Sequence, residues 1–286
     1  MDDFRMAYAI QCHKNPEQLN NLIDKISDEE VDIFIHVDEK SSIMNAINKN
    51  NNIYFTDKRF NVKWGHSSQF FATVELLEKI DKTADYDYIH FISGQDYPIK
   101  CKDEIKSFFK ENYGKQFIQY RPLPNDWPYN GMSRVLVHYP HFLFANEFTR
   151  KIMYKYEKLV MKITAFQRNI ESLPKLYGGS CWFSITGDCM KYILEFLHKN
   201  PDYIKFFQNT HCGDEIFFQT ILVNSKYRQH LFNDNMRYID WSNGGASPKV
   251  LLEEDFQKLQ NSHKLYARKL DYNMDSNLFE KLNEIV

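Results

Sequence analysis

The stretch Ala7-Tyr8-Ala9-Ile10-Gln11-Cys12, followed by Asn15-Pro16-Glu17, sets the pattern from which the fold is predicted. The first six residues are mostly apolar, which favours a short buried strand. Proline suits the first turn of a helix, because the N–H group that it lacks would have no helical partner there. Leu19, Leu22 and Ile26 continue at helical spacing. We therefore predict a strand followed directly by a helix that ends near Ile26.

The same alternation continues through the first half of the chain. Strands that alternate with helices form βαβ units, in which the strands lie parallel. We therefore predict an α/β fold in which helices flank a mostly parallel central sheet. Further strands are predicted at 31–37, 53–55 and 88–93, and helices at 42–49 and from a cap at Ser67 or Ser68 onward.

Polar residues follow the predicted strands. His13, Asp38, the segment 64–68 and the pair Gln95–Asp96 all lie at or after strand ends. Ligands of parallel sheets bind beyond the carboxyl ends of the strands. These residues are therefore expected on one rim of the sheet, in an arrangement typical of a binding site.

The pattern loosens after about residue 104. No repeat, low-complexity tract or linker divides the chain, so we predict a single domain over residues 1–286. The predicted elements are a strand at 117–120, a proline-rich loop at 121–128, a basic helix at 148–170, a strand after the turn at 178–182, a helix at 188–199 and a strand at 237–241.

The segment 211–222 predicts a helix with one buried face and two acids, Asp214 and Glu215, in its first turn. Carboxylates are favourable there because they interact with the positive end of the helix dipole. A helix start alone therefore accounts for both acids and is the favoured interpretation of this segment, so a catalytic role needs support from other parts of the chain.

Composition excludes several classes of protein. Lys and Arg number 36 against 38 acids, a net charge of −2 that gives no argument for nucleic-acid binding. No apolar run reaches the length of a membrane span, and residues 1–5 lack the pattern of a signal peptide. The five cysteines show no metal-binding spacing, which favours free thiols in a reducing cytosol. For the basic helix at 148–170 we expect a solvated face, with attachment to an anionic membrane surface as the alternative.

Several ordered motifs connect these observations. They are Val37-Asp38-Glu39-Lys40-Ser41, Trp64-Gly65, Gly94-Gln95-Asp96-Tyr97-Pro98, Gly178-Gly179-Ser180-Cys181-Trp182-Phe183, Asp214-Glu215 with Phe217-Phe218, Asp240-Trp241 with Ser247-Pro248, and Ala267-Arg268-Lys269-Leu270-Asp271. Together they resemble the family of core-2/I-branching β-1,6-N-acetylglucosaminyltransferases and peptide O-xylosyltransferases, and the last motifs are nearer the xylosyltransferase branch. The resemblance covers residues 13–271.

The resemblance implies a GT-A-type, Rossmann-like fold and inverting transfer of GlcNAc or xylose from a UDP-sugar without a metal or other cofactor. It implies a nucleotide-sugar-binding half over 1–120 and an acceptor-binding and catalytic half over 121–286. The residues that match functional positions of the family are Glu215 as catalytic base; His13, Asp38, Arg237, Arg268 and Lys269 for the donor and its diphosphate; and Trp64, Asp96, Trp182 and Asp214 for the acceptor.

Inverting transfer requires one base that removes the proton of the acceptor hydroxyl. The leaving diphosphate requires a metal or fixed cations. The Asp85-Tyr86-Asp87 motif precedes its strand and is expected on the wrong rim for a metal, which leaves Arg237, Arg268 and Lys269 as the candidate cations.

Several of these residues also have an ordinary structural explanation. Arg268 and Lys269 also fit ordinary surface basicity, Asp96 fits a turn, and Trp64 and Trp182 fit either the core or sugar-stacking platforms. A non-catalytic nucleotide-sugar or glycan-binding protein is the second hypothesis, and a metal-dependent transferase or a hydrolase is the third.

The expected acceptor is a glycan or lipid-linked oligosaccharide. The expected setting is a bacterial cytoplasm, with peripheral contact at the inner face of the membrane, because the chain lacks the anchor, stem and disulfides of the family's eukaryotic members.

Overall fold

The computed structural model describes residues 4–286, so Met1–Asp3 of the N-terminal stretch considered above lie outside the described residues. Its central sheet has seven strands in the order β10-β6-β9-β4-β1-β2-β3. β9 runs antiparallel to both neighbours, and every other pair in this sheet is parallel. The predicted α/β fold with a mostly parallel sheet is therefore confirmed. The strands are β1 (Met6–Cys12), β2 (Val31–Val37), β3 (Ile53–Phe55), β4 (Tyr88–Ser93), β6 (Gln116–Ile118), β9 (Phe183–Thr186) and β10 (Leu231–Phe232).

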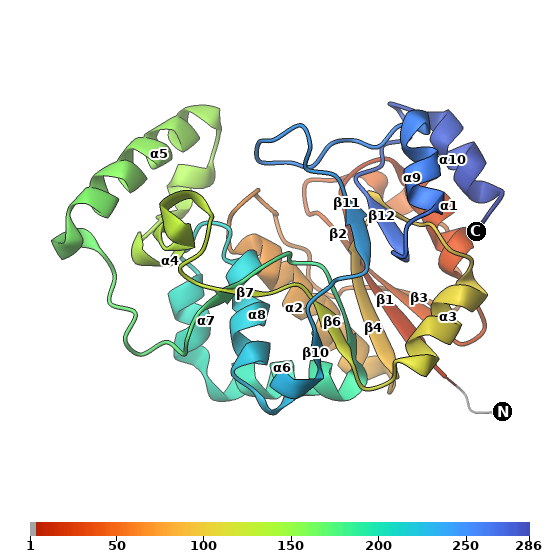
Figure 1. Ribbon diagram of the computed structural model, residues 1–286, viewed down its shortest axis with the longest axis horizontal. Helices are drawn as coiled ribbons and strands as arrows, with labels where there is room; N and C mark the ends of the chain where they lie inside the picture. Colours follow the sequence, from red (N-terminus) through yellow and green to blue (C-terminus); the bar gives the residue numbers. More distant parts are fainter. Residues whose placement is uncertain (1–3) are drawn as a thin grey trace.

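Helices cover both faces of this sheet (Figure 1). Side chains alternate across a strand, so Tyr8 and Ile10 of β1 join the core on one face, while Ala7 and Ala9 join the core on the other. A strand covered on both faces reads as a nearly continuous apolar run, which explains the opening segment. The first core packs against α1 (Pro16–Ile26), α3 (Lys102–Glu111), α9 (Phe256–Gln260) and α10 (Ser276–Asn283), and the second against α2 (Ser68–Thr83), α6 (Gly187–Lys199), α7 (Pro201–Phe207) and α8 (Asp214–Val223).

Two small sheets complete the fold. β12 (Tyr266–Arg268) lies between β11 (Arg237–Ile239) and β5 (Asp96–Pro98), and its antiparallel register with β5 places Arg268 opposite Asp96. β7 (Arg121–Pro122) pairs with β8 (Tyr177–Gly178). The remaining segments are α4 (Ser133–Leu136), α5 (Glu147–Lys162) and the 3₁₀ turns η1 (Ile43–Ala46), η2 (Pro128–Gly131), η3 (His141–Phe144), η4 (Thr164–Phe166), η5 (Lys226–His230) and η6 (Glu253–Asp255).

Three local predictions need correction. The helix expected at 42–49 is only the turn η1, because Asn48 N–H bonds to the side chain of Asn20 and Ile47 is extended. The strand expected to reach residue 241 ends at Ile239, since Asp240 accepts a bond from the N–H of Ser242 and forms a turn. The basic helix expected at 148–170 ends at Lys162.

Neither serine caps α2 as predicted. Ser67 occupies the cap position, but its side chain makes no capping hydrogen bond. The hydroxyl of Ser68 instead accepts a bond from the N–H of Lys63, which holds the preceding loop. Within residues 4–286, no helix has the length and apolar character required to cross a bilayer.

Candidate active site

A cavity of about 1270 Å³ opens at the carboxyl ends of β1, β2 and β4. His13, Asp38 and Gln95, which follow these three strands, lie in its wall together with Trp64. His13, Asp38 and Gln95 therefore lie at one edge of the sheet, as predicted, because the loops that follow parallel strands emerge at the same edge. The second half of the chain contributes further residues to the lining of this cavity, including Glu215 and Lys269.

All four tryptophans of the chain line this cavity: Trp64, Trp127, Trp182 and Trp241. Trp64 and Trp241 are 44% and 53% exposed, so their ring faces are accessible to a ligand. Trp182 is buried, and its ring packs against Phe91 and beneath the guanidinium of Arg268, 4.1 Å from the ring centroid. Trp64 and Trp241 thus fit stacking platforms, whereas Trp182 supports a cation.

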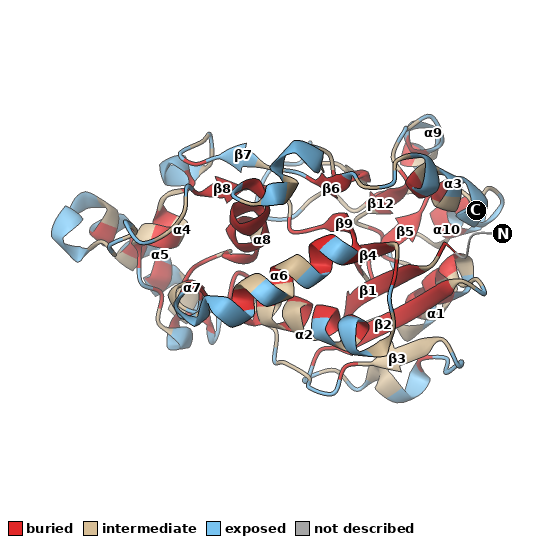
Figure 2. Ribbon diagram, turned by 90° about the horizontal axis from the view of Figure 1, so that it is seen from below, coloured by how far each residue is buried: buried red, intermediate tan, exposed pale blue. Residues whose placement is uncertain are grey.

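Glu215 is presented to the cavity by a buried helix. The sequence predicts one buried face for this helix, but α8 is buried along most of its length on all sides (Figure 2). Glu215 is its one residue of intermediate exposure. Gly213 directly precedes the helix. A Cβ atom at this position would lie 2.2 Å from the hydroxyl of Thr210. The backbone of Glu215 is fixed as well, since its carbonyl accepts a 2.8 Å bond from the N–H of Gly179. The only side chain of α8 with substantial exposure is therefore a carboxylate in the cavity.

Arg134 of α4 forms an ion pair with this carboxylate, and the two side chains are 19% and 32% exposed. Its guanidinium also lies 3.9 Å from the ring centroid of Trp127. Neither Arg134 nor Trp127 is predicted from the sequence as a site residue, because neither stands in a motif and 81 positions separate Arg134 from Glu215. The ion pair and the ring contact together fix the direction of the Glu215 carboxylate.

Asp214, the neighbouring acid, is buried beside Glu215 in the wall of the cavity. Burial, followed by repulsion from Glu215, raises the pKa of Asp214 to about 7, although Arg134 acts in the opposite direction. Removing the charge of one buried carboxyl relieves the repulsion within the pair. Asp214 is thus arranged to be neutral over much of the acidic pH range while its neighbour faces the cavity.

Cations form the wall of the cavity at β12 and at the loops that follow β1 and β2. Lys269, Arg268, Lys14 and Lys40 all line it. Burial, and then the charges of Arg268 and Lys14, lowers the pKa of Lys269, while Asp271 partly offsets these effects. The positive charge in this wall is concentrated enough to disfavour the protonated form of Lys269. Such a wall is suited to an anionic ligand.

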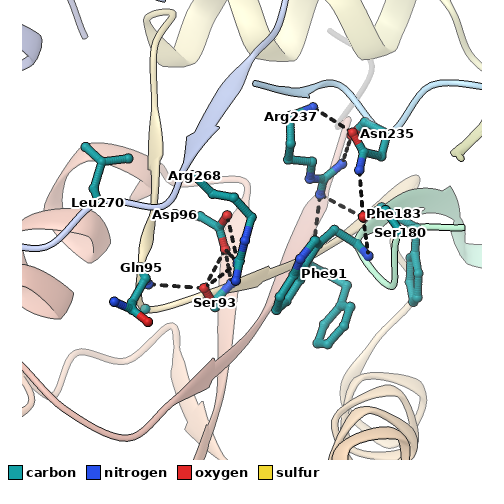
Figure 3. Close-up of polar contacts among 12 residues, drawn as sticks. Phe91, Ser93, Gln95, Asp96, Ser180, Phe183, Asn235, Arg237, Arg268 and Leu270 are labelled. Carbon is teal, nitrogen blue, oxygen red and sulfur yellow. Dashed lines mark hydrogen bonds and ion pairs between the residues drawn. The ribbon is translucent and has the colours of Figure 1, made fainter. Parts of the chain in front are cut away.

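The pairing of β5 with β12 places Arg268 beside Asp96, and the ion pair between them holds Arg268 in position (Figure 3). Its Nη1 atom donates to Asp96 Oδ2 and to the hydroxyl of Ser93, both at 2.9 Å. Asp96 is fully buried and does not line the cavity. The structure therefore does not bring Asp96 to an acceptor site, and the carboxylate anchors Arg268 instead.

Arg237, which is predicted to contact the donor diphosphate, lies away from the cavity. Its side chain is buried between β4 and β9, where it donates to the carbonyls of Phe183 and Phe91 at 2.8 and 3.1 Å and to the hydroxyl of Ser184 at 2.9 Å (Figure 3). It does not line the cavity. Because β11 directs this side chain under the sheet, Arg237 is not placed to contact a diphosphate there.

The Asp85-Tyr86-Asp87 motif precedes β4, at the end away from the cavity. Asp85 pairs with Lys191, and Asp87 accepts a bond from the N–H of Arg5. Across residues 4–286, no group of three or more His, Cys, Asp or Glu side chains has an arrangement that could hold a metal ion.

The chain is thus an α/β protein with a carboxylate and a cluster of cations in one cavity at the carboxyl edge of a mostly parallel sheet. The chain belongs to the Core-2/I-branching enzyme family, a family of glycosyltransferases, whose model matches residues 6–260. It is similar to xylosyltransferase 2 of Rattus norvegicus, at 23% identity over 98% of this chain and 33% of the relative. Xylosyltransferase sqv-6 of Caenorhabditis elegans is 23% identical over 96% of this chain and 36% of the relative. The chain thus spans about a third of the length of these relatives.

Proposed function

We propose that this chain is an inverting glycosyltransferase that moves xylose or N-acetylglucosamine from a UDP-sugar to a hydroxyl group of a glycan. The observation that carries the proposal is that one cavity contains both the Glu215 carboxylate, held by its ion pair with Arg134, and the cations Arg268 and Lys269. Family membership and the names of the similar xylosyltransferases support the class of donor.

In the proposed reaction, Glu215 accepts the proton of the acceptor hydroxyl. The hydroxyl oxygen forms a bond to the anomeric carbon, and the bond from that carbon to the diphosphate oxygen breaks on the opposite side. The diphosphate leaves with the electron pair as UDP. Because the new bond forms opposite the old one, one transfer inverts the anomeric centre and needs no second carboxylate.

We propose that fixed cations, and not a metal, stabilise the charge that develops on the leaving UDP. Lys269 supplies a point charge in the cavity, and Arg268 is oriented by Asp96 and Ser93. The two carboxylates of the Asp-x-Asp motif are engaged elsewhere. His13 and Asp38 lie on the same cavity and are proposed to contact the nucleotide or sugar.

Trp64 and Trp241 are proposed to stack against sugar rings, since both are exposed in the cavity. The acceptor glycan, including a lipid-linked oligosaccharide on the cytoplasmic side of a membrane, is part of the same proposal. Asp214 lies beside Glu215 and is proposed to influence the electrostatic environment of this base.

Calorimetry with free UDP tests the proposed donor site. Binding is expected in excess EDTA and unchanged with Mn²⁺, and Lys269→Ala is expected to weaken it by about tenfold or more. Lys199→Ala, which removes an exposed lysine of α6, is the matched control. Binding that requires Mn²⁺ would contradict the cationic site.

Release of UDP from UDP-xylose and UDP-GlcNAc in the presence of glycan acceptors tests the reaction itself. Tight UDP binding without turnover of either donor would favour a non-catalytic nucleotide-sugar-binding protein.

A further inference from the structure

The helix α5 extends from the body of the protein, at the end opposite the chain termini (Figure 1). It packs mainly on η3, α4 and η4, and its buried contacts come from Met153 and Val160. These two residues occupy one face of the helix, together with the buried Glu157. The opposite side of α5 is free to contact something outside the chain.

An apolar row runs along that free side. Phe148, Ile152, Leu159 and Ile163 are spaced by four or seven residues, so they lie along one face of the helix and its last turn. They are 71%, 42%, 50% and 38% exposed. Several large apolar side chains exposed along one helix face are unfavourable in water, which favours a binding role for this surface.

A row of lysines lies beside the apolar row. Lys151, Lys155, Lys158 and Lys162 share their own face and are all exposed. In residues 4–286, no carboxylate lies within ion-pair distance of the last three, whereas Lys151 approaches Glu147 at 3.5 Å. Exposed lysines on α6 and α7 differ in this respect, because Lys199 and Lys205 have carboxylate partners. The free side of α5 is therefore both apolar and positively charged.

A second depression, of about 360 Å³, connects this helix with the site. It is bordered by Asn146 and Arg150 at the start of α5, and it shares Lys40, Val62 and Trp64 with the large cavity. A molecule held at α5 could therefore extend into the cavity along Trp64.

We propose that α5 docks on the surface of an anionic lipid bilayer, with the apolar row in the headgroup–acyl boundary and the lysine row on lipid phosphates. Charge complementarity selects this occupant, because a helix with an apolar face beside unpaired lysines has the features of an interfacial membrane helix. The docking does not depend on the reaction proposed above. It would bring the cavity to acceptors that are themselves anchored in the bilayer.

Vesicle co-sedimentation of the whole chain tests this proposal. The chain is expected to bind vesicles of phosphatidylcholine with about one third phosphatidylglycerol, to bind pure phosphatidylcholine at least about tenfold more weakly, and to be released by high salt. Lys155→Gln with Lys158→Gln should reduce binding to the anionic vesicles by about tenfold or more. Lys199→Gln with Lys205→Gln removes the same charge from α6 and α7 and should leave binding unchanged.

Phe148→Ser with Leu159→Ser tests the apolar row, and a comparable loss of binding is expected. UDP binding by this double variant shows that the fold and cavity are retained. Light scattering in solution separates the bilayer from a second copy of the chain. A dimer that dissociates on Leu159→Ser would assign the apolar row to self-association and overturn the proposal. Vesicle binding that does not depend on lipid charge, or that neither double variant reduces, would overturn it as well.

Discussion

Arg134 donates a hydrogen bond to the carboxylate of Glu215, so the proposed base is held by a cation from a different part of the chain. The same guanidinium lies over the ring of Trp127. Two contacts of different kinds therefore restrict the movement of the pair. Arg134 is therefore expected to position the base, although no sequence motif identifies it.

Arg134→Met is expected to lower kcat for sugar transfer by about ten- to a hundredfold, because a misdirected base loses its alignment with the acceptor hydroxyl. UDP affinity should remain within about twofold. Steady-state kinetics and calorimetry together check both points. Arg228→Met, at an exposed arginine of η5, is the control. An equal loss of UDP affinity would indicate that Arg134 belongs to the donor site.

Glu215→Gln is expected to lower kcat by about a hundred- to ten-thousandfold, because the amide cannot accept the hydroxyl proton. The amide is nearly the same size, so UDP should still bind with unchanged affinity. Transfer rates are compared with those of Glu280→Gln, which changes an exposed glutamate of α10. Near-normal turnover by Glu215→Gln would exclude this residue as the base.

Asp214 should make stability fall as the pH rises. Its folded-state pKa of about 7 lies above the unfolded value of 3.8, so the folded protein binds the additional proton between these pH values. The contribution is fully present below about pH 4 and is lost as the pH rises through 7. Asp214→Asn removes this dependence.

Urea unfolding at pH 5 and pH 8 measures the effect. From pH 5 to pH 8, the stability of Asp214→Asn relative to the unsubstituted protein is expected to increase by up to about 3 kcal/mol. Asp202→Asn, at an exposed acid of α7, should show no such change. A constant difference across this pH range would show that Asp214 titrates normally.

Asp96→Asn is expected to destabilise the fold by about 3 kcal/mol, because it leaves the guanidinium of Arg268 without its buried partner. UDP affinity should fall as well, since Arg268 loses the contact that orients it. Urea unfolding and calorimetry measure the two effects. Binding that stays unchanged while stability falls would show that Arg268 does not contact the diphosphate.

Trp241→Ala is expected to raise the KM for a sugar substrate by about tenfold while stability changes by less than about 0.5 kcal/mol, because the ring is half exposed in the cavity. Trp64→Ala should behave similarly. Phe232→Ala removes an exposed aromatic ring outside the cavity and serves as the control. A large loss of stability in either tryptophan variant would identify a packing role.

The sequence predicts the main sheet well, because strands covered on both faces consist of nearly continuous runs of apolar residues. β1, β2 and β4 were found where the apolar runs indicate. Polar residues that follow those strands, such as His13 and Asp38, were placed at one rim by the parallel arrangement alone. Shorter elements such as β12 carry no comparable signal, since three residues cannot establish a period.

Local sequence therefore determined the α/β fold, the carboxyl-edge location of the cavity and the position of Glu215 at the start of α8. Tertiary structure decided which charges meet. Arg237 and Arg268 have the same chemistry, but β11 directs one under the sheet while β12 pairs the other with Asp96 beside the cavity. The contact of Arg134 with Glu215 likewise joins distant segments. Such pairings depend on strand register and on packing between separate elements, which the periodicity of a single segment does not contain.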